Sequence, residues 1–367
     1  MTAPTHFKRD IFRQTSELAT TVKLLAEMYR PRLARAAELV RDSRYVFLTG
    51  IGASWNAAMG TAALFGQRGF PVYTVEAAEL LYDTTVPPGS VVIAISRSGR
   101  SAEIVQLSAK LRQAGATLIG ITNSPDSPLA KESSVAIVIP IQLDYAISVN
   151  TYSTLLVAAA ALASFDTPDF DSSCASFLAA LPAVEKSVSA WEEMVSHSPW
   201  LDPERNFYFL ARGPSIASCY QARLLWEEGA KSPATAMTSS GFRHGPQEII
   251  VPGMRFCMWI DGMKMRAEDL AVAEDLKTLR TTVALIGQDL PTHAADLIFQ
   301  IPPVPAGWQF AVDVIPMQLA AETLALLRGV DCDSFRICSY IVENEYGLLG
   351  KDHPRKLNGG RIGLKDS

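Results

Sequence analysis

The sequence predicts an α/β protein in which a parallel sheet flanked by helices occurs twice. Short runs of β-branched and other apolar residues alternate with helical patterns of about 10–15 residues, which is typical of parallel βαβ units with helices on both faces of the sheet. The order of these elements recurs in the second half of the chain. Phe47 and Phe209 are 162 residues apart, and Ile119 and Ile286 are 167 residues apart. A nearly constant offset indicates two copies of one unit.

Length and composition fit this fold class and exclude several others. At roughly 150 residues per domain, 367 residues suggest two or three domains. A hydrophobic content of 48% excludes general disorder. The formal charge of −5 argues against a nucleic-acid-binding protein, which would show a basic face. The five cysteines form no C-x-x-C pair, as expected for reduced thiols in a cytosolic protein.

Neither a secretion signal nor a membrane span is expected. The N-terminus lacks the apolar core of a signal peptide. The longest uninterrupted apolar stretch, 155–163, is much shorter than the roughly 20 residues that cross a bilayer. We therefore expect a soluble cytoplasmic protein without membrane contact.

The pattern divides the chain into five parts. In the first half it predicts strands at 45–49, 72–75, 91–95, 118–122 and 135–139 and helices at 56–67, 77–82, 101–114 and 155–165. In the second half it predicts strands at 206–211, 255–260, 282–286 and 297–301, with a helix from about 216 to 229. The predicted divisions are an N-terminal helical segment (1–44), a first α/β domain (45–165), a helical linker (166–204), a second α/β domain (205–345) and a C-terminal tail (346–367).

Two loops at neighbouring strand ends suggest an anion site. Gly50, Gly52 and Ser54 follow the first strand, where glycines let the backbone approach a ligand and helix N–H groups attract negative charge. The loop lacks the third glycine of a dinucleotide fingerprint and the Lys-Ser/Thr pair of a P-loop, and a plain tight turn is the alternative. The loop after strand 91–95 is richer, and it contains Ser96, Arg97, Ser98, Gly99, Arg100 and Ser101.

Hydroxyls and backbone amides that converge in this second loop make a phosphate cradle. The alternative is a helix cap supplied by Ser101. Two such loops side by side favour an anion site at the carboxyl edge of the sheet, where α/β folds bind ligands. The polar stretch 144–151, which contains Ser148 and Asn150, precedes an apolar helix and is typical of a capped helix start.

Glu228 and His244 are the candidate acid/base pair. Glu228 lies at a predicted helix end, and His244 follows Arg243 in a turn-rich loop over 238–246. A carboxylate and an imidazole can move protons near neutral pH. The alternative is that the carboxylate, which lies close to Lys231 in the sequence, is a solvated surface group. The other histidines have no such context, and no spacing resembles a metal site.

Several motifs together resemble one known family. They are Gly52-Ala-Ser54-x-Asn56, Ile95-Ser-Arg-Ser-Gly-Arg-Ser101, Ser148-x-x-Thr-Tyr152, Ala211-Arg-Gly213, Leu225-Trp-Glu-Glu228 and Phe242-Arg-His-Gly-Pro246. In this order they resemble the double sugar-isomerase (SIS) domain proteins, above all the isomerase half of glucosamine-6-phosphate synthase. Amino-sugar-6-phosphate deaminases and fructosamine-6-phosphate deglycases are stand-alone relatives in that family. The resemblance covers about 45–336 and implies two tandem SIS domains, each a flavodoxin-like three-layer sandwich.

The resemblance also implies roles for individual residues. The family's proton-transferring glutamate falls on Glu228 and its ring-opening histidine on His244, which in relatives comes from a partner subunit and so implies a homodimer. Positions that would contact the substrate in other ways are Asn150, Arg243 and Tyr340. The residues that would hold the sugar phosphate are Gly52, Ser54, Ser96, Arg97, Ser98, Ser101 and Ser148. No metal or other cofactor is implied.

Three family lysines are replaced in this chain. Tyr340 stands where the synthase has the lysine that forms a Schiff base, and a phenol cannot form an imine. Leu225 and Asn150 replace two further lysines. Because the matching region begins within about 45 residues of Met1, we also expect no glutaminase domain and no glutamine-driven amination within this chain.

These features predict an enzyme that acts on a hexose 6-phosphate or amino-sugar 6-phosphate by proton transfer between C1 and C2, with release of an amine. A plain aldose–ketose isomerase is an alternative that needs no amine. A non-catalytic sugar-phosphate sensor is an alternative of another class, although 1–44 looks too short for a DNA-binding domain. For the charged stretch 351–356, contact with the active site and a solvated end both stay open.

Overall fold

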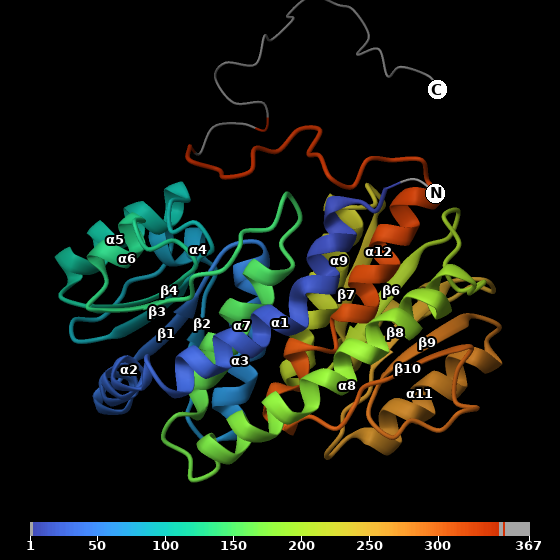
Figure 1. Cartoon of the computed structure of the whole chain (residues 1–367), viewed down its shortest axis with the longest axis horizontal. Helices are drawn as coiled ribbons and strands as arrows, with labels where there is room; N and C mark the ends of the chain where they lie inside the picture. Colours follow the sequence, from blue (N-terminus) through green and yellow to red (C-terminus); the bar gives the residue numbers. More distant parts are fainter. Residues whose placement is uncertain (1–2, 345–347, 349–367) are drawn as a thin grey trace, which may run out of the picture.

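The structure, a computed structural model, consists of two parallel five-stranded sheets that lie side by side with helices around and between them (Figure 1). It describes residues 3–344 and residue 348. The strand orders are β2-β1-β3-β4-β5 and β10-β9-β8-β6-β7. Counted within each sheet, both follow the order 2-1-3-4-5, which is the flavodoxin-like order. The predicted α/β fold with two parallel sheets is confirmed.

The first sheet is buried on both faces, as expected for a parallel sheet. Every residue of β1 and β3 is buried. These two strands pair with Val46 opposite Val91. The strands are β1 (Val46–Thr49), β2 (Tyr73–Thr74), β3 (Val91–Ile95), β4 (Thr117–Thr122) and β5 (Val135–Val138). The helices that alternate with them are α3 (Ala53–Gln67), α4 (Ala77–Tyr82), α5 (Ala102–Ala114) and α6 (Pro128–Glu132).

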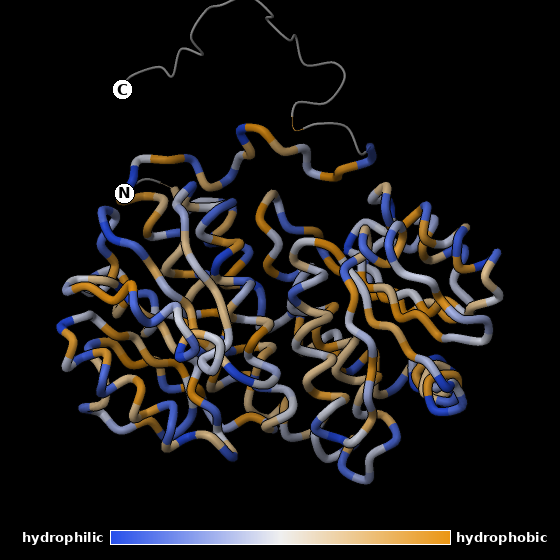
Figure 2. Tube along the Cα trace, turned by 180° about the vertical axis from the view of Figure 1, so that it is seen from behind, coloured by the Kyte–Doolittle hydropathy of each residue, from blue (hydrophilic) through white to orange (hydrophobic). Residues whose placement is uncertain are grey.

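The second sheet repeats this arrangement with different helices. Its strands are β6 (Phe207–Ala211), β7 (Ala234–Thr238), β8 (Arg255–Trp259), β9 (Thr282–Gly287) and β10 (Leu297–Gln300). Its helices are α9 (Ile216–Glu228), α10 (Ser239–Arg243) and α11 (Arg266–Thr278), with short 3₁₀ turns η1 (Gly213–Ser215) and η2 (Pro246–Ile249). Seen from behind, hydrophobic stretches of chain cross the interior of both halves, and many of the most hydrophilic stretches lie at the periphery (Figure 2).

A layer of helices joins the two halves. It contains α1 (His6–Ala26), α2 (Arg30–Asp42), α7 (Asn150–Ser164), α8 (Phe170–Ser196), η3 (Ala306–Ala311) and α12 (Ile315–Leu327). All residues of α7 are buried, because it packs between α1 and α3. Helices α3 and α9 also pack directly on each other. At Gly60 an added Cβ would lie 2.6 Å from the Ala217 Cβ, so only glycine permits this approach. The division into domains and linker made from the sequence stays a prediction.

One stretch of the described chain, Ala306–Leu327, is long and apolar enough to cross a membrane by length and composition alone. The sequence pattern did not point to it. In the fold, 83% of its most apolar window is buried. A helix that is apolar on all sides and enclosed in this way is typical of a protein core.

Helix starts were the least accurate part of the sequence prediction. Helix α3 begins at Ala53 and α7 at Asn150, earlier than the expected 56 and 155. The stretch 238–246, expected as a loop, contains α10, and β7 before it was not expected. The first turn of α7 is polar, and its amides are capped from outside the helix, so the apolar pattern begins late. Ser101 does precede α5, but its hydroxyl makes no capping bond.

The capping group of α7 is the carboxylate of Asp144, which is inaccessible to solvent. It accepts bonds from the backbone N–H groups of Val149, Asn150 and Thr151 at 2.8–3.1 Å. It also accepts the Thr151 hydroxyl at 2.7 Å. An anion at the first turn of a helix satisfies free amides and interacts well with the helix dipole. The loop 145–148 is thereby held against α7.

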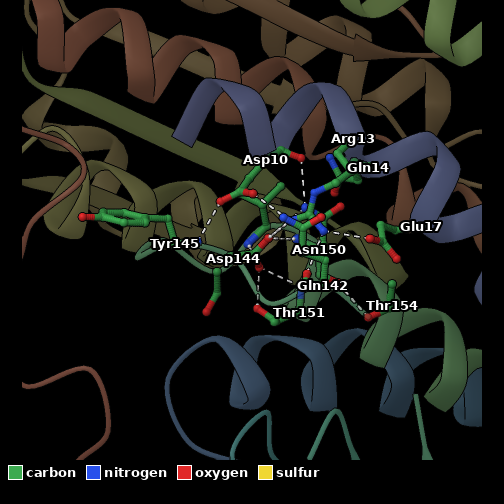
Figure 3. A network of polar contacts seen from close by, with 12 residues as sticks. Asp10, Arg13, Gln14, Glu17, Gln142, Asp144, Tyr145, Asn150, Thr151 and Thr154 are labelled. Atoms are coloured by element: carbon green, nitrogen blue, oxygen red, sulfur yellow. Dashed lines mark hydrogen bonds and ion pairs between the residues drawn. The ribbon is translucent and has the colours of Figure 1, made fainter. Parts of the chain in front are cut away.

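Helix α1 completes this polar network (Figure 3). The Arg13 guanidinium donates to Asp10 and Glu17 at 2.7 Å and reaches Asp144 at 3.4 Å. It also donates to the Gln142 carbonyl at 2.7 Å. Asp10 in turn accepts the Tyr145 N–H at 2.9 Å. The loop before α7 is therefore fixed from two sides, by α1 and by α7.

We expect Asp144→Asn to lower the free energy of unfolding by about 1–3 kcal/mol, because an amide cannot accept all the bonds that the buried carboxylate accepts. Urea unfolding measures the change. Asp126→Asn, in an exposed turn, is the matched control and should change stability by less than about 0.5 kcal/mol. Equal stabilities of the Asp144 variant and the control would contradict the role of Asp144.

Candidate functional site

A cavity of about 230 Å³ lies at the carboxyl ends of β1 and β3. These strands are neighbours, and their connections leave to opposite sides of the sheet, so their following loops leave a crevice between them. The residues that line it are Ile51, Gly52, Ala53, Ser54, Ser96, Arg97, Ser98, Ser101, Glu103, Ala146, Ser148, Glu228, Phe335, Cys338, Ser339, Tyr340, Ile341 and Val342. Nine of the predicted site residues are among them.

The loop after β1 forms one wall. Gly52 precedes α3 and has φ +57°, a conformation that favours glycine. No atom lies within 4 Å of a Cβ added there, so the backbone conformation is what requires glycine. Ser54 follows in the first turn of α3 and lines the cavity with its neighbours.

The loop after β3 forms the opposite wall. Ser96 Oγ accepts the Gly99 N–H at 3.1 Å, and Ser98 Oγ accepts the Arg100 N–H at 3.2 Å. Each hydroxyl keeps its own proton to donate to a ligand. Gly99 has φ +57°, and a Cβ there would lie 2.4 Å from Ser127 Oγ, so the tight loop needs glycine. The loop leads directly into the N-terminus of α5.

Arg97 links this loop to two other parts of the site. Its guanidinium donates to Ser148 Oγ at 3.2 Å and to the Tyr340 carbonyl at 2.7 Å. It also lies over the Tyr340 ring, 3.9 Å from the ring centroid. A cation over an aromatic face is favourable, above all where water is partly excluded. Arg97 therefore links Ser148 and Tyr340, which both line the cavity.

Glu228 brings a titratable carboxyl group into the cavity from the second half of the chain. It is the last residue of α9. Burial raises the pKa of Glu228 to about 7, against the lowering effect of the nearby Arg97 and Lys231 charges. Glu227 adds a smaller raising effect on this pKa. Near neutral pH both forms of Glu228 are populated, which suits a group that accepts a proton and returns it.

Residues 335–342, here called the C-terminal segment, close the cavity. In Figure 1 the chain after α12 runs across from the second half toward the first. The Tyr340 hydroxyl donates to the Asp144 carbonyl at 3.0 Å. The Val342 carbonyl accepts the Ala102 N–H, in the first turn of α5, at 3.1 Å. Of the five cysteines, Cys338 in this segment is exposed and the other four are buried free thiols.

Three predicted site residues lie outside this cavity. His244 and Arg243 are exposed at the end of α10, and Arg243 lines a separate cavity of about 430 Å³ beside α11. Asn150 is buried, and its amide donates to the Asp10 carbonyl at 2.9 Å and to Asp144 at 2.8 Å. Both amide protons are thus used within the protein. The structure gives Asn150 a structural role in place of the expected substrate contact.

Several cavity residues were not anticipated from the sequence. Glu103 and Ala146 complete the walls, and the C-terminal segment except Tyr340 was not assigned to the site. The segment has no helical or strand periodicity, and only its contacts show where it lies. Among the described residues, no group of three or more His, Cys, Asp or Glu side chains is placed to hold a metal ion. The stretch 351–356 and the rest of the tail, apart from residue 348, lie outside the described residues.

Comparison with known proteins identifies the first half of the chain. Residues 39–164 match the family model described as SIS domain. The chain is 25% identical over 312 residues to glutamine–fructose-6-phosphate aminotransferase [isomerizing] of Pyrococcus horikoshii. The matched region covers 82% of this chain and 52% of that relative. It is 26% identical over 351 residues to the enzyme of the same name from Aeropyrum pernix, covering 90% and 56%. The chain thus spans about half the length of these curated relatives.

Solved structures share the fold over almost the whole chain. The C-terminal domain of glucosamine-fructose-6-phosphate aminotransferase from Francisella tularensis has a TM-score of 0.79 at 19% identity, covering 90% of this chain and 98% of that one. Glucosamine-6-phosphate deaminase from Thermotoga maritima has a TM-score of 0.72 at 20% identity, covering 92% and 99%. Tagatose-6-phosphate ketose/aldose isomerase from Escherichia coli has a TM-score of 0.78 at 18% identity, covering 91% and 96%.

At these identities the solved structures show the fold alone. The match to the family model concerns residues 39–164. That matched region contains both loops of the cavity and the strands that carry them. Residues 39–164 thus match a SIS domain, and the chain is similar over 82–90% of its length to about half of the isomerizing glutamine–fructose-6-phosphate aminotransferases.

Proposed function

We propose that this protein is a cytoplasmic enzyme that transfers a proton between C1 and C2 of an amino-sugar 6-phosphate and releases the amine. One observation carries the proposal: a carboxyl group with a pKa of about 7, on Glu228, faces the same cavity as the serine-rich loop after β3. The names of the T. maritima deaminase and of the aminotransferases, which refer to hexose or hexosamine 6-phosphates, support this substrate class.

The phosphate would bind between the two loops. Hydroxyl protons of Ser96, Ser98 and Ser101 and the amides at the N-terminus of α5 are the donors that a phosphate needs. Arg97 adds a positive charge at the cavity mouth. Since the whole chain carries a charge of −5, attraction of a phosphate has to come from these local groups. A phosphate at α5 would compete with the Val342 carbonyl for the Ala102 N–H.

Glu228 would move the proton. With a 2-amino aldose opened to its aldehyde, the carboxylate takes the proton from C2, the electron pair forms the C1–C2 double bond, and the aldehyde oxygen takes up a proton, which gives an enolamine. Return of the proton from Glu228 to C1, with loss of one proton from the nitrogen, leaves an imine at C2. Water adds to this imine and the amine departs, so that a ketose 6-phosphate remains. Each step is balanced by proton transfer and one water molecule.

The same transfer without an amine is an aldose–ketose isomerisation. The likeness of the fold to the E. coli tagatose-6-phosphate isomerase supports this second candidate. Covalent catalysis through an imine with the enzyme has no support at position 340, because the side chain there is a phenol and it donates to the Asp144 carbonyl.

His244 would open the sugar ring from a second copy of the chain. It is exposed and lies away from the cavity that Glu228 faces in its own chain. Ile249 and Val251, which follow it closely, are 44% and 57% exposed, as expected for apolar side chains that a partner covers. We infer a homodimer in which each active site combines Glu228 of one chain with His244 of the other.

A screen of amino-sugar 6-phosphates, fructosamine 6-phosphates and hexose 6-phosphates tests the reaction. Ammonia, free amine and hexose phosphate are the products to measure. We expect turnover of at least one substrate, and Glu228→Gln should lower its rate by about 10²- to 10⁴-fold while phosphosugar binding persists. Glu227→Gln, on the exposed neighbour, is the control. If no compound of the screen reacts, the non-catalytic sensor is the better reading.

The pH dependence follows from the raised pKa of Glu228. If the carboxylate is the base, kcat/KM should rise with pH and level off above about 7, because the protonated group cannot accept a proton. With an ordinary exposed glutamate as the base, this rise of kcat/KM, the acid limb of the pH profile, would lie near pH 4.3. An acid limb that stays near pH 4–5 would show that another group accepts the proton.

The phosphate site can be tested by binding alone. The double change Ser98→Ala and Ser101→Ala should weaken binding of a hexose 6-phosphate by about 10- to 100-fold, because each hydroxyl bond to a charged phosphate is lost. Affinity for the unphosphorylated sugar should not change. Isothermal titration calorimetry measures both. Ser187→Ala, whose hydroxyl bonds only its own helix, is the control. Equal losses for the two ligands would contradict the assignment.

The shared active site predicts complementation between two inactive variants. In a heterodimer of Glu228→Gln and His244→Ala chains, one site carries both changes and the other carries neither. Co-expression of the two variants should therefore restore activity that neither homodimer has. If His244 acts within its own chain or not at all, the mixture will be no more active than the variants alone.

A further inference from the structure

Lys231 joins the end of α9 to the chain that leads into the C-terminal segment. It lies three residues beyond Glu228, in the turn between α9 and β7. Its ammonium donates to the Glu228 carbonyl at 2.6 Å and to the Ser334 carbonyl at 2.7 Å. Ser334 immediately precedes Phe335, which lines the cavity. One side chain therefore connects the backbone of the candidate base to the segment that closes the site.

The backbone at Lys231 is held in an unfavourable conformation. Its φ of +51° lies in the left-handed region, which is unfavourable for a residue other than glycine. The turn persists because other contacts determine it: Gly229 N–H donates to the Leu225 carbonyl at 2.8 Å, and Arg328 donates to the Ala230 carbonyl at 3.1 Å. Glycine would suit this backbone better. A lysine at this position is then explained by what its side chain does.

The electrostatic environment also favours a positive charge on the Lys231 ammonium. It lies at the C-terminus of α9, where free carbonyls and the helix dipole favour a positive charge. The charged and titratable groups that face it are Glu228, Asp331, Cys332 and Arg336. Burial lowers the pKa of Lys231. The charged and titratable groups that face Glu228 are Arg97, Lys231, Glu227 and Cys338.

We propose that Lys231 is a positioning residue of the candidate active site, which fixes the end of α9 that carries Glu228 against the C-terminal segment that covers the cavity. The kinetic part of this inference rests on the proposed function. The structural part does not, since it concerns a contact within the chain. Without the ammonium, the C-terminal segment loses one of its anchors, and Glu228 loses a nearby positive charge.

The anchor is tested by the reactivity of Cys338 toward iodoacetamide. In native protein Cys338 is the exposed thiol and the other four are buried, so its alkylation reports on the C-terminal segment. Lys231→Met should speed alkylation about tenfold, the effect of losing a hydrogen bond from a charged group. Lys231→Gly removes the backbone strain but also lacks the ammonium. In this variant Cys338 should be alkylated as fast as in Lys231→Met. Lys231→Arg should stay near the wild-type rate.

Lys110→Met is the matched control for removing a lysine that holds carbonyls. The Lys110 ammonium donates to three carbonyls, of Leu80, Leu81 and Thr84, at 2.6–3.0 Å, away from the cavity. It should leave the Cys338 rate unchanged. Thermal unfolding of each variant shows whether the fold is intact. An unchanged Cys338 rate in folded Lys231→Met and Lys231→Gly would overturn the proposal.

Turnover of a phosphosugar supplies a second readout. For Lys231→Met we expect KM to rise about tenfold and the acid limb of kcat/KM to move to higher pH, because loss of a nearby positive charge raises the pKa of a carboxyl group. Lys231→Arg should restore both. A wild-type KM in Lys231→Met, whatever the position of the pH limb, would contradict the positioning role. If the wild type turns over no phosphosugar, the proposed function fails, and the Cys338 rates still decide the role of Lys231.

Discussion

The buried carboxylate of Asp144 is the constraint on which the rest of the site depends. It caps α7, and α7 lies between α1 and α3, so the same group joins the central helices to the first sheet. The loop that it holds carries Ser148 into the cavity, where the hydroxyl meets Arg97. The Asp144 carbonyl receives the Tyr340 hydroxyl, so the C-terminal segment is docked on the same residue. Charge burial, helix capping and closure of the cavity are thus consequences of one residue's placement.

The two sheets share a strand order, but they differ at their carboxyl edges. In the first sheet, the Ser96 and Ser98 hydroxyls accept hydrogen bonds from loop amides after β3, and the Val342 carbonyl accepts one from the start of α5. A cavity of about 230 Å³ remains there. At the corresponding edge of the second sheet, the Asp261 carboxylate accepts the amides of residues 263–265. There Arg212 is paired with Asp269 at 2.6 Å, and the space left is about 40 Å³. The second sheet instead contributes Glu228, through the end of α9, to the cavity of the first. The architecture is duplicated, and the candidate site lies at the carboxyl edge of the first sheet.

The two loops that line the cavity could be singled out from the sequence because their residues carry local signals. A positive φ at Gly52 and Gly99 and serines between a strand and a helix are features that a short stretch specifies by itself. The start of α7 was placed too late because the amides of its first turn are satisfied by Asp144, which precedes the helix and whose carboxylate folds back onto it. Asn150, expected from the resemblance as a possible substrate contact, lies in the same buried network, where its two amide protons are donated to Asp10 and Asp144.

The sequence by itself determined the two α/β halves, the order of the five strands in the first and the positions of both cavity loops, because periodicity and turn chemistry act over a few residues. It missed β7 and α10 in the second half. Only the tertiary structure decided which distant groups meet these loops. Glu228, Lys231 and the C-terminal segment come together through packing of α3 on α9 and through contacts of single side chains. The raised pKa of Glu228 likewise follows from burial, which no stretch of sequence records. Long-range contacts and desolvation depend on the whole fold, and the chemistry of the site depends on both.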